Sequence, residues 1–198
     1  MRRRSASAAG PSAARWEMEV GVFIEGISHG SSTLRGYSRG GQHLGMEVLP
    51  LTLADSRQIA SWRYPGPYAT YDVSEIVTAE RGFWAVHDEG QLVGYCCFGD
   101  EARVPGVVEE PGVLDVGYGM KPDLMGRGLG RGFIRSILEF GAGEYDPRRS
   151  RLLILAWNAR SLAAARSVGF DEVGVVRSAE GMFVVMTKAM DETPPSDA

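Results

Sequence analysis

Hydrophobic positions along residues 46–190 alternate between strand-like and helix-like spacing. Alternating or continuous apolar runs predict strands at residues 47–51, 82–87, 91–98, 113–121, 151–157, 170–177 and 182–188. Helical spacing and capping residues predict helices at residues 52–62, 127–144 and 158–168. The order β-α-loop-β-β-β-α-β-α-β-β combines hairpins with crossover helices. It therefore predicts an α/β fold in which a central mixed sheet carries helices on both faces.

Local signals set several of these boundaries. Residues 88–90, Asp-Glu-Gly, form a tight turn that predicts a hairpin between the second and third strands. Apart from Arg151, the run at 151–157 is apolar, which is typical of a strand buried on both faces. Gly169 is suited to end the last helix as its C-cap. Residues 62–71 contain prolines and a glycine, so this aromatic segment is predicted to be a loop.

The composition changes near Met46. Residues 1–45 are rich in Ser, Gly, Ala and Arg, and such a segment buries too little apolar surface to fold. We predict a disordered extension over 1–45, one domain over 46–190 and a flexible tail over 191–198. The basic start lacks the apolar stretch of a secretion signal, whereas its composition is compatible with a transit peptide. Another hypothesis is that the natural start is Met46.

Charge and cysteine content exclude several classes of function. The net charge is −4, with 21 basic and 25 acidic residues, which disfavours a nucleic-acid partner. No stretch approaches the roughly 18 apolar residues of a membrane span. Cys96 and Cys97 are adjacent, so their side chains point to opposite faces of a strand and favour neither a disulfide nor a shared metal. We expect buried thiols, a cytoplasmic protein and no metal site.

A glycine-rich turn, Met125-Gly126-Arg127-Gly128-Leu129-Gly130, joins a predicted strand to a predicted helix. The N–H groups of the first helical turn and the helix dipole favour an anion there, and glycines let the backbone approach a diphosphate. Arg127 and Arg131 add positive charge. The spacing fits neither the dinucleotide fingerprint nor the ATP loop, which disfavours a nucleotide-binding α/β protein.

These residues resemble the GNAT acyltransferase superfamily over about residues 46–189. The family carries Q/R-x-x-G-x-G/A at this place; Gly128 and Gly130 match it, whereas Met125 replaces the usual Gln or Arg. A backbone N–H from Met125 can still bind phosphate, but a side-chain contact is lost. The strand exit Met120-Lys121-Pro122 is similar too. So is a second element, Asn158-Ala159-Arg160-Ser161 followed by Val168-Gly169-Phe170.

The resemblance implies an acyl-CoA N-acyltransferase fold, in which the strands at 113–121 and 151–157 are parallel but splayed. It implies acetyl-CoA as donor substrate, with the pantetheine arm in the gap and the diphosphate on the glycine-rich turn. Ser161 can equally be a local helix-start residue. The residues implied to bind the cofactor are Tyr118, Gly119, Met120, Met125, Gly126, Arg127, Gly128, Leu129, Gly130, Arg131, Asn158 and Ser161.

Direct acetyl transfer needs a general base and often an acid for the leaving sulfur. Asp115 is the first candidate for the base, although it can equally be a strand-end carboxylate paired with an arginine. Weaker candidates are Glu80, Glu109 and Glu110. Tyr118 is a second catalytic candidate that can orient the thioester or simply pack. Many relatives place a tyrosine acid seven residues after the Asn; here that position is Ala165. The chain is therefore identified as a bacterial member that resembles the branch in which this acid is commonly absent and which acetylates protein N-termini and small amines.

The aromatic segment offers an acceptor pocket whose wall would be Trp62, Tyr64, Tyr68 and Tyr71, although these rings can equally cap the edge of the core. We expect an N-acetyltransferase that acts on a primary amine of a small molecule, peptide or protein, as a monomer or homodimer. The alternative is a non-catalytic acyl-CoA-binding or sensing module of the same fold.

Overall fold

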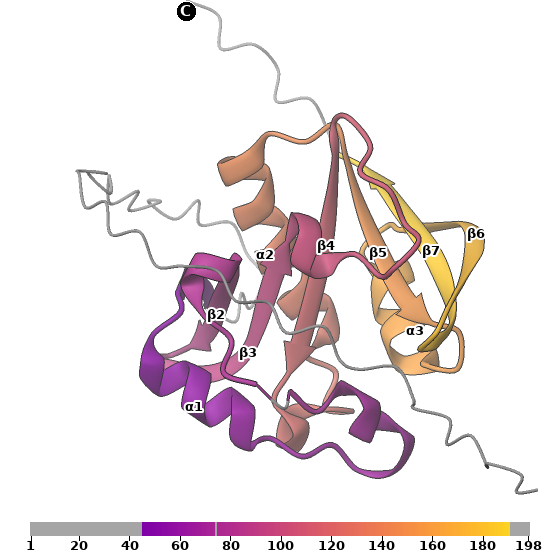
Figure 1. Cartoon of the computed structure of the whole chain (residues 1–198). Coiled ribbons are helices and arrows are strands. Elements are labelled where there is room, and N and C mark those ends of the chain that lie inside the picture. Colours follow the sequence, from indigo (N-terminus) through magenta and orange to yellow (C-terminus); the bar gives the residue numbers. More distant parts are fainter. Residues whose placement is uncertain (1–44, 74, 191–198) are drawn as a thin grey trace, which may run out of the picture. The chain divides into compact units, whose positions relative to one another are not determined.

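The computed structural model describes residues 45–73 and 75–190, and the expectations for residues 1–44 and 191–198 lie outside this part of the chain. Its strands form one sheet in the order β1-β2-β3-β4-β5-β7-β6 (Figure 1). The strands are β1 (Met46–Pro50), β2 (Phe83–Asp88), β3 (Gln91–Phe98), β4 (Val113–Met120), β5 (Arg149–Leu155), β6 (Asp171–Ser178) and β7 (Gly181–Ala189). The helices are α1 (Leu53–Ser61), α2 (Gly130–Tyr145) and α3 (Ala159–Ser167). Short 3₁₀ turns are η1 (Gly66–Tyr71), η2 (Ala79–Arg81), η3 (Gly99–Ala102) and η4 (Pro122–Leu124).

Every predicted strand and helix is present, and the differences lie at their ends. Helix α2 begins at Gly130 rather than at residue 127, because Gly126 and Gly128 take positive φ values of 75° and 81°. Strand β5 ends at Leu155, and Ala156 then donates its N–H to the carbonyl of Met182. The turn between β2 and β3 has positive φ at both Glu89 and Gly90, as a two-residue hairpin requires.

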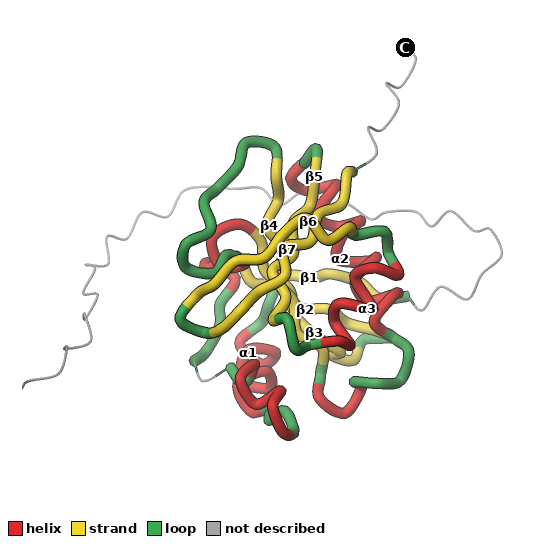
Figure 2. The backbone as a smooth tube through the Cα atoms, turned by 90° about the vertical axis from the view of Figure 1, so that its right-hand side faces the viewer, coloured by secondary structure: helices red, strands yellow, loops and turns green. Residues whose placement is uncertain are grey.

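Helices cover both faces of the sheet, as expected. One core joins α2 and α3 to the sheet and contains Phe133, Ile137 and Leu162. The second core lies on the opposite face, where Ile59 of α1 packs with Phe83. Figure 2 shows α1 on one side of the sheet and α2 with α3 on the other.

Cys96 and Cys97 contribute one thiol to each core, and both are free and buried. This is the arrangement expected from their adjacency in a strand.

Strands β4 and β5 form a fork. They pair in parallel only through Val113↔Arg149, Leu114↔Ser150 and Asp115↔Arg151. Beyond Asp115, β4 continues to pair with β3, and β5 continues to pair with β7. The separation of the two arrows is visible in Figure 1. The predicted mixed sheet with a splay between these strands is therefore confirmed.

Candidate functional site

A cavity of about 500 Å³ opens where β4 and β5 separate. Its lining comes from the second half of β4, the middle of β5, the glycine-rich turn, the start of α2, and the first turns of α3. Tyrosines from η1 and from β3 complete it. The fork in the sheet thus creates the space, and the two helices close its far side.

The glycine-rich turn forms one end of this cavity. No side chain caps the start of α2, because the N-cap residue is Leu129, whose apolar side chain has no hydrogen-bond acceptor. The free N–H groups of the first helical turn therefore remain available to an anion. At Gly130 a Cβ atom would lie 3.2 Å from Ala164 Cβ, so α2 and α3 approach closely here. Met125 and Arg131 line the cavity, whereas Arg127 is exposed and does not.

The edge of β4 that faces the fork exposes backbone groups to the cavity. Lys121 donates its N–H to the Val93 carbonyl at 2.8 Å, which fixes the alternation of the ladder with β3. In an antiparallel ladder, alternate residues direct their backbone groups toward the partner strand. The N–H and C=O groups of Gly119 therefore face β3, whereas those of Tyr118 and Met120 face the fork. The Met120 carbonyl accepts a hydrogen bond from the Tyr64 hydroxyl at 2.9 Å. The backbone groups of Tyr118 thus face the cavity, because β5 no longer pairs with this part of β4.

Hydrogen bonds join the two sides of the cavity. The Tyr118 hydroxyl on β4 lies 2.9 Å from Ser161 Oγ on α3. Asn158 caps α3 by accepting from the Ser161 N–H at 3.1 Å, and its Nδ2 donates to the Tyr71 hydroxyl at 3.0 Å. Burial raises the pKa of Tyr118 to about 12, although the bond with Ser161 acts to lower it. Burial also raises the pKa of Tyr71.

The aromatic segment divides between cavity and core. Tyr64, Tyr68 and Tyr71 line the cavity and stay candidates for an acceptor wall. Trp62 does not: it is buried in the core beneath α1, with its ring centroid 6.2 Å from that of Tyr95. For this residue the core-edge interpretation applies, because the chain turns away after α1 and carries the indole inward.

Sequence reasoning missed other cavity residues. Tyr95 on β3 lies over Gly119, where an added Cβ would approach the ring to 2.4 Å. Arg160 lines the mouth, with its guanidinium carbon 5.1 Å from the Tyr68 ring centroid. Tyr68 also packs edge-on against Trp157 at 5.2 Å. The pairing of Tyr95 with a glycine across two strands is visible only once the register is known.

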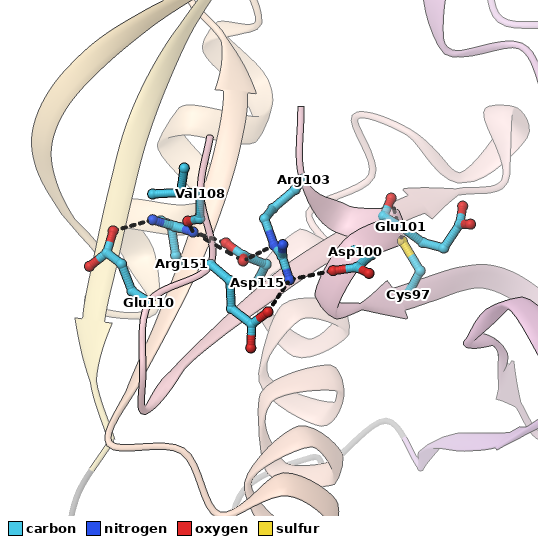
Figure 3. A network of polar contacts seen from close by, with 9 residues as sticks. Cys97, Asp100, Glu101, Arg103, Val108, Glu110, Asp115 and Arg151 are labelled. Carbon is cyan, nitrogen blue, oxygen red and sulfur yellow. Dashed lines mark hydrogen bonds and ion pairs between the residues drawn. The ribbon is translucent and has the colours of Figure 1, made fainter. Parts of the chain in front are cut away.

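Asp115 lies outside the cavity lining, in a buried ion network near the base of the fork (Figure 3). Its carboxylate accepts from Arg103 Nε at 2.8 Å, and from Arg151 Nε at 2.6 Å and Nη2 at 3.1 Å. Arg151 also bonds the carbonyl of Val108 and the carboxylate of Glu110. Both carboxylate oxygens of Asp115 are engaged, which argues against a general base and corrects our first candidate. The alternative, a strand-end carboxylate paired with arginine, describes the geometry.

The weaker base candidates also lie away from the cavity lining. Glu109 is 3.7 Å from Arg103 and largely exposed, and Glu110 is committed to Arg151. Glu80 is exposed in η2. Among the described residues, those that line the cavity include no Asp, Glu or His, but they include tyrosines from β3, β4 and η1.

Residues 45–73 and 75–190 contain no group of three or more His, Cys, Asp or Glu side chains placed to hold a metal ion. Their helices are all too short or too polar to cross a membrane.

Comparison with known proteins identifies the family. The family model described as an acetyltransferase (GNAT) domain matches residues 46–171. The chain belongs to the GNAT acetyltransferase family. A similar protein, the N-alpha-acetyltransferase RimI of Mycobacterium tuberculosis, is 30% identical over 134 residues, which cover 64% of this chain and 79% of the relative. The resemblance inferred from the glycine-rich turn and the Asn158 element is thus confirmed.

Solved structures of the family share the fold of this GNAT protein. Aminoglycoside acetyltransferase AAC(6')-Ib in complex with ribostamycin and coenzyme A is 19% identical, with a TM-score of 0.61 over 77% of this chain and 99% of that chain. The same enzyme with paromomycin and acetyl-CoA gives the same values. A GNAT acetyltransferase from Bacillus anthracis is 12% identical, with a TM-score of 0.58 over 73% of this chain and 94% of the other.

Proposed function

We propose that this GNAT protein transfers an acetyl group from acetyl-CoA directly to a primary amine of a small molecule, a peptide or a protein. The observation that carries the proposal is the cavity, which runs from the uncapped start of α2 into the fork between β4 and β5. A cofactor with a diphosphate at one end and a flexible arm at the other fits a site of this kind. The proposal includes the expectation of a cytoplasmic monomer or homodimer with no nucleic-acid partner.

The donor end of the cavity supports acetyl-CoA. The diphosphate would bind the backbone of Met125–Gly130, where Gly126 and Gly128 leave open space. Arg131, which lines the cavity, and Arg127, which lies outside the lining, would supply positive charge to it. The pantetheine arm would follow the backbone of Tyr118, Gly119 and Met120 along the fork. Asn158 and Ser161 would lie on the opposite side.

The acceptor end is defined by aromatic side chains. Tyr64, Tyr68 and Tyr71 surround the part of the cavity that η1 covers. Two kinds of acceptor are represented among similar proteins, because RimI is named as an N-alpha-acetyltransferase and AAC(6')-Ib was solved with aminoglycosides. Both present an amine, and we propose an amine acceptor on that common ground.

One observation favours the alternative, a non-catalytic acyl-CoA-binding or sensing module. The described cavity lining offers no carboxylate or imidazole as a general base, and Ala165 replaces the tyrosine acid of many relatives. A module that only binds acyl-CoA would need neither group. The two functions share the donor site and differ only in turnover.

Binding is tested by thermal unfolding with acetyl-CoA, CoA, ATP and NAD. A ligand at 100 times its dissociation constant stabilises the folded state by about 2.7 kcal/mol. We expect a shift with acetyl-CoA and CoA only; no shift with either would refute both functions. Gly128→Ala should weaken the shift, because a Cβ would strain the positive φ and crowd the phosphate. Gly143→Ala, at an open position of α2, is the matched control.

Turnover is tested by thiol release from acetyl-CoA with a panel of small primary amines and peptides. Amine-dependent release supports the acetyltransferase. Binding of acetyl-CoA without release across the panel would support the sensing module instead.

A further inference from the structure

The leaving sulfur requires a proton. At the position where many members of the family carry a tyrosine acid, this chain has Ala165, which is fully buried and has no proton to give. When the acetyl–sulfur bond breaks, the coenzyme leaves as a thiolate and must gain one proton. Among the described cavity residues, arginines keep their proton at all accessible pH values, and the hydroxyls of Ser161 and Ser167 are far weaker acids than a phenol, so the side chains that can give up a proton are tyrosines. One of these tyrosines is therefore the candidate acid.

Three of the cavity tyrosines are engaged elsewhere or displaced from the fork. Tyr64 donates its hydroxyl proton to the Met120 carbonyl. Tyr95 is packed between Trp62 and Phe83, with ring centroids 6.2 Å and 6.1 Å away. Tyr68 lies at the mouth beneath Arg160 and against Trp157.

Tyr71 is held by the cap of α3. Its hydroxyl accepts from Asn158 Nδ2 at 3.0 Å, a contact that fixes its position without using its own proton. It belongs to η1, the cover of the cavity, rather than to the strands that form the fork.

Tyr118 differs from the others in position and in partner. It is on β4, on the stretch whose backbone faces the fork, and its hydroxyl bonds another hydroxyl, Ser161 Oγ, at 2.9 Å. A serine hydroxyl can accept from a phenol and, after rotation, donate to a phenolate, so it can serve Tyr118 in both protonation states. Ser161 is itself fixed, because its N–H is bonded to Asn158 Oδ1 in the cap of α3. The positive end of that helix also favours a transient phenolate.

We propose that Tyr118 donates the proton to the departing coenzyme A thiolate, and that Ser161 is a positioning residue that holds the Tyr118 hydroxyl. The inference rests on the proposed acetyl transfer. The amine nitrogen forms a bond to the acetyl carbon, the carbon–sulfur bond breaks, and its electron pair goes to sulfur. Sulfur takes the Tyr118 proton, the phenolate accepts a hydrogen bond from Ser161, and the proton lost by the amine passes to solvent, from which Tyr118 is reprotonated.

The ionisation of Tyr118 is compatible with this role. Burial raises its pKa to about 12, so the hydroxyl holds its proton throughout the neutral range. The hydrogen bond with Ser161 lowers that pKa, so loss of Ser161 makes Tyr118 a weaker acid. Among the described residues, Tyr71 is the other titratable group whose charge acts on it.

The test compares variants in steady-state thiol release, with acetyl-CoA affinity measured separately by thermal shift. Tyr118→Phe should lower kcat by about 10²- to 10⁴-fold, the range for general acid catalysis, with little change in acetyl-CoA affinity. Ser161→Ala should lower kcat by a smaller factor, and Ser161→Thr should restore it. In the Tyr118→Phe background, Ser161→Ala should have no further effect. Tyr145→Phe and Ser136→Ala, on α2 outside the cavity lining, are the matched controls.

A pH profile separates proton donation from mere packing. Replacement of Tyr118 by a fluorinated tyrosine lowers the phenol pKa without changing its shape, and should move the alkaline decline of kcat to lower pH. Normal kcat in Tyr118→Phe, or an unmoved profile, would overturn this inference alone while wild-type turnover stands. An equal loss from Ser161→Ala with and without Tyr118 would overturn the positioning role. A wild-type chain that binds acetyl-CoA but never releases thiol would overturn the proposed transfer as well.

Discussion

Asp115→Asn distinguishes a structural carboxylate from a catalytic one. Asp115 is 2% exposed and neutralises Arg151, which is 5% exposed, as well as Arg103. The asparagine side chain keeps the volume but removes the charge, and it points an amide N–H group at guanidinium donors. Removal of one partner of a buried ion pair costs about 3–5 kcal/mol, because the remaining charge is left uncompensated. For a domain of this size each kcal/mol lowers Tm by about 2–4 °C, so we expect a loss of roughly 6–20 °C.

The assay pairs thermal or urea unfolding with thiol release measured well below the variant's Tm. Asp100→Asn is the matched control, since Asp100 bonds the same Arg103 but its side chain is 88% exposed, and such pairs contribute about 0–1 kcal/mol. The structural role of Asp115 would be refuted if Asp115→Asn unfolded like the wild type yet lost turnover at unchanged acetyl-CoA affinity. That result would restore Asp115 as the general base.

Three further substitutions test other parts of the structure. Gly119→Ala should cost about 1–3 kcal/mol in urea unfolding, because its Cβ would approach the Tyr95 ring to 2.4 Å. Tyr71→Phe should cost about 1–3 kcal/mol by leaving the buried Asn158 amide without its acceptor, and should raise the KM of the amine more than that of acetyl-CoA. Thr52→Ala should cost about 1 kcal/mol at neutral pH by breaking the capping box with Asp55. Burial raises the pKa of Asp55, but the hydrogen bonds from Thr52 and His87 outweigh burial, so the pKa is lowered in the folded state. The ionised Asp55 therefore stabilises the fold above about pH 4, and this contribution is lost in acid. The difference in unfolding free energy between Thr52→Ala and the wild type should shrink accordingly in unfolding curves recorded in acid.

Periodicity and turn chemistry were sufficient to predict the fold, because each element carries its own local signal. The apolar residues that follow Arg151 belong to β5, an inner strand whose residues 150–155 are buried or half-buried on both faces, and Gly90 permits the hairpin that joins β2 to β3. The start of α2 was missed by three residues, since sequence alone does not show that Gly126 and Gly128 leave helical φ.

Prediction of the site was more limited, because it depends on tertiary contacts. Short motifs with fixed spacing were enough to propose a donor end, and Gly128 and Asn158 of these motifs both line the cavity. The general base could not be predicted, because the role of Asp115 depends on its ion pairs with Arg103 and Arg151, which are 12 and 36 residues away in sequence. Likewise, the sequence does not show that Tyr118 reaches across the fork to Ser161, a contact between residues 43 positions apart.

Ala165 and Tyr118 provide a last test of where the acid lies. Ala165 is fully buried in the core that Tyr118 packs against, and its carbonyl accepts from Val168 and Phe170 at the end of α3. A tyrosine placed there would add a ring to a closed core, and overpacking of this kind costs about 1–3 kcal/mol or more. We therefore expect Ala165→Tyr to lower Tm and to leave the kcat of Tyr118→Phe unrescued in the double variant. If Ala165→Tyr instead kept its Tm and restored turnover without Tyr118, the cavity would accept an acid from α3, and the assignment of proton donation to β4 would lose its structural basis.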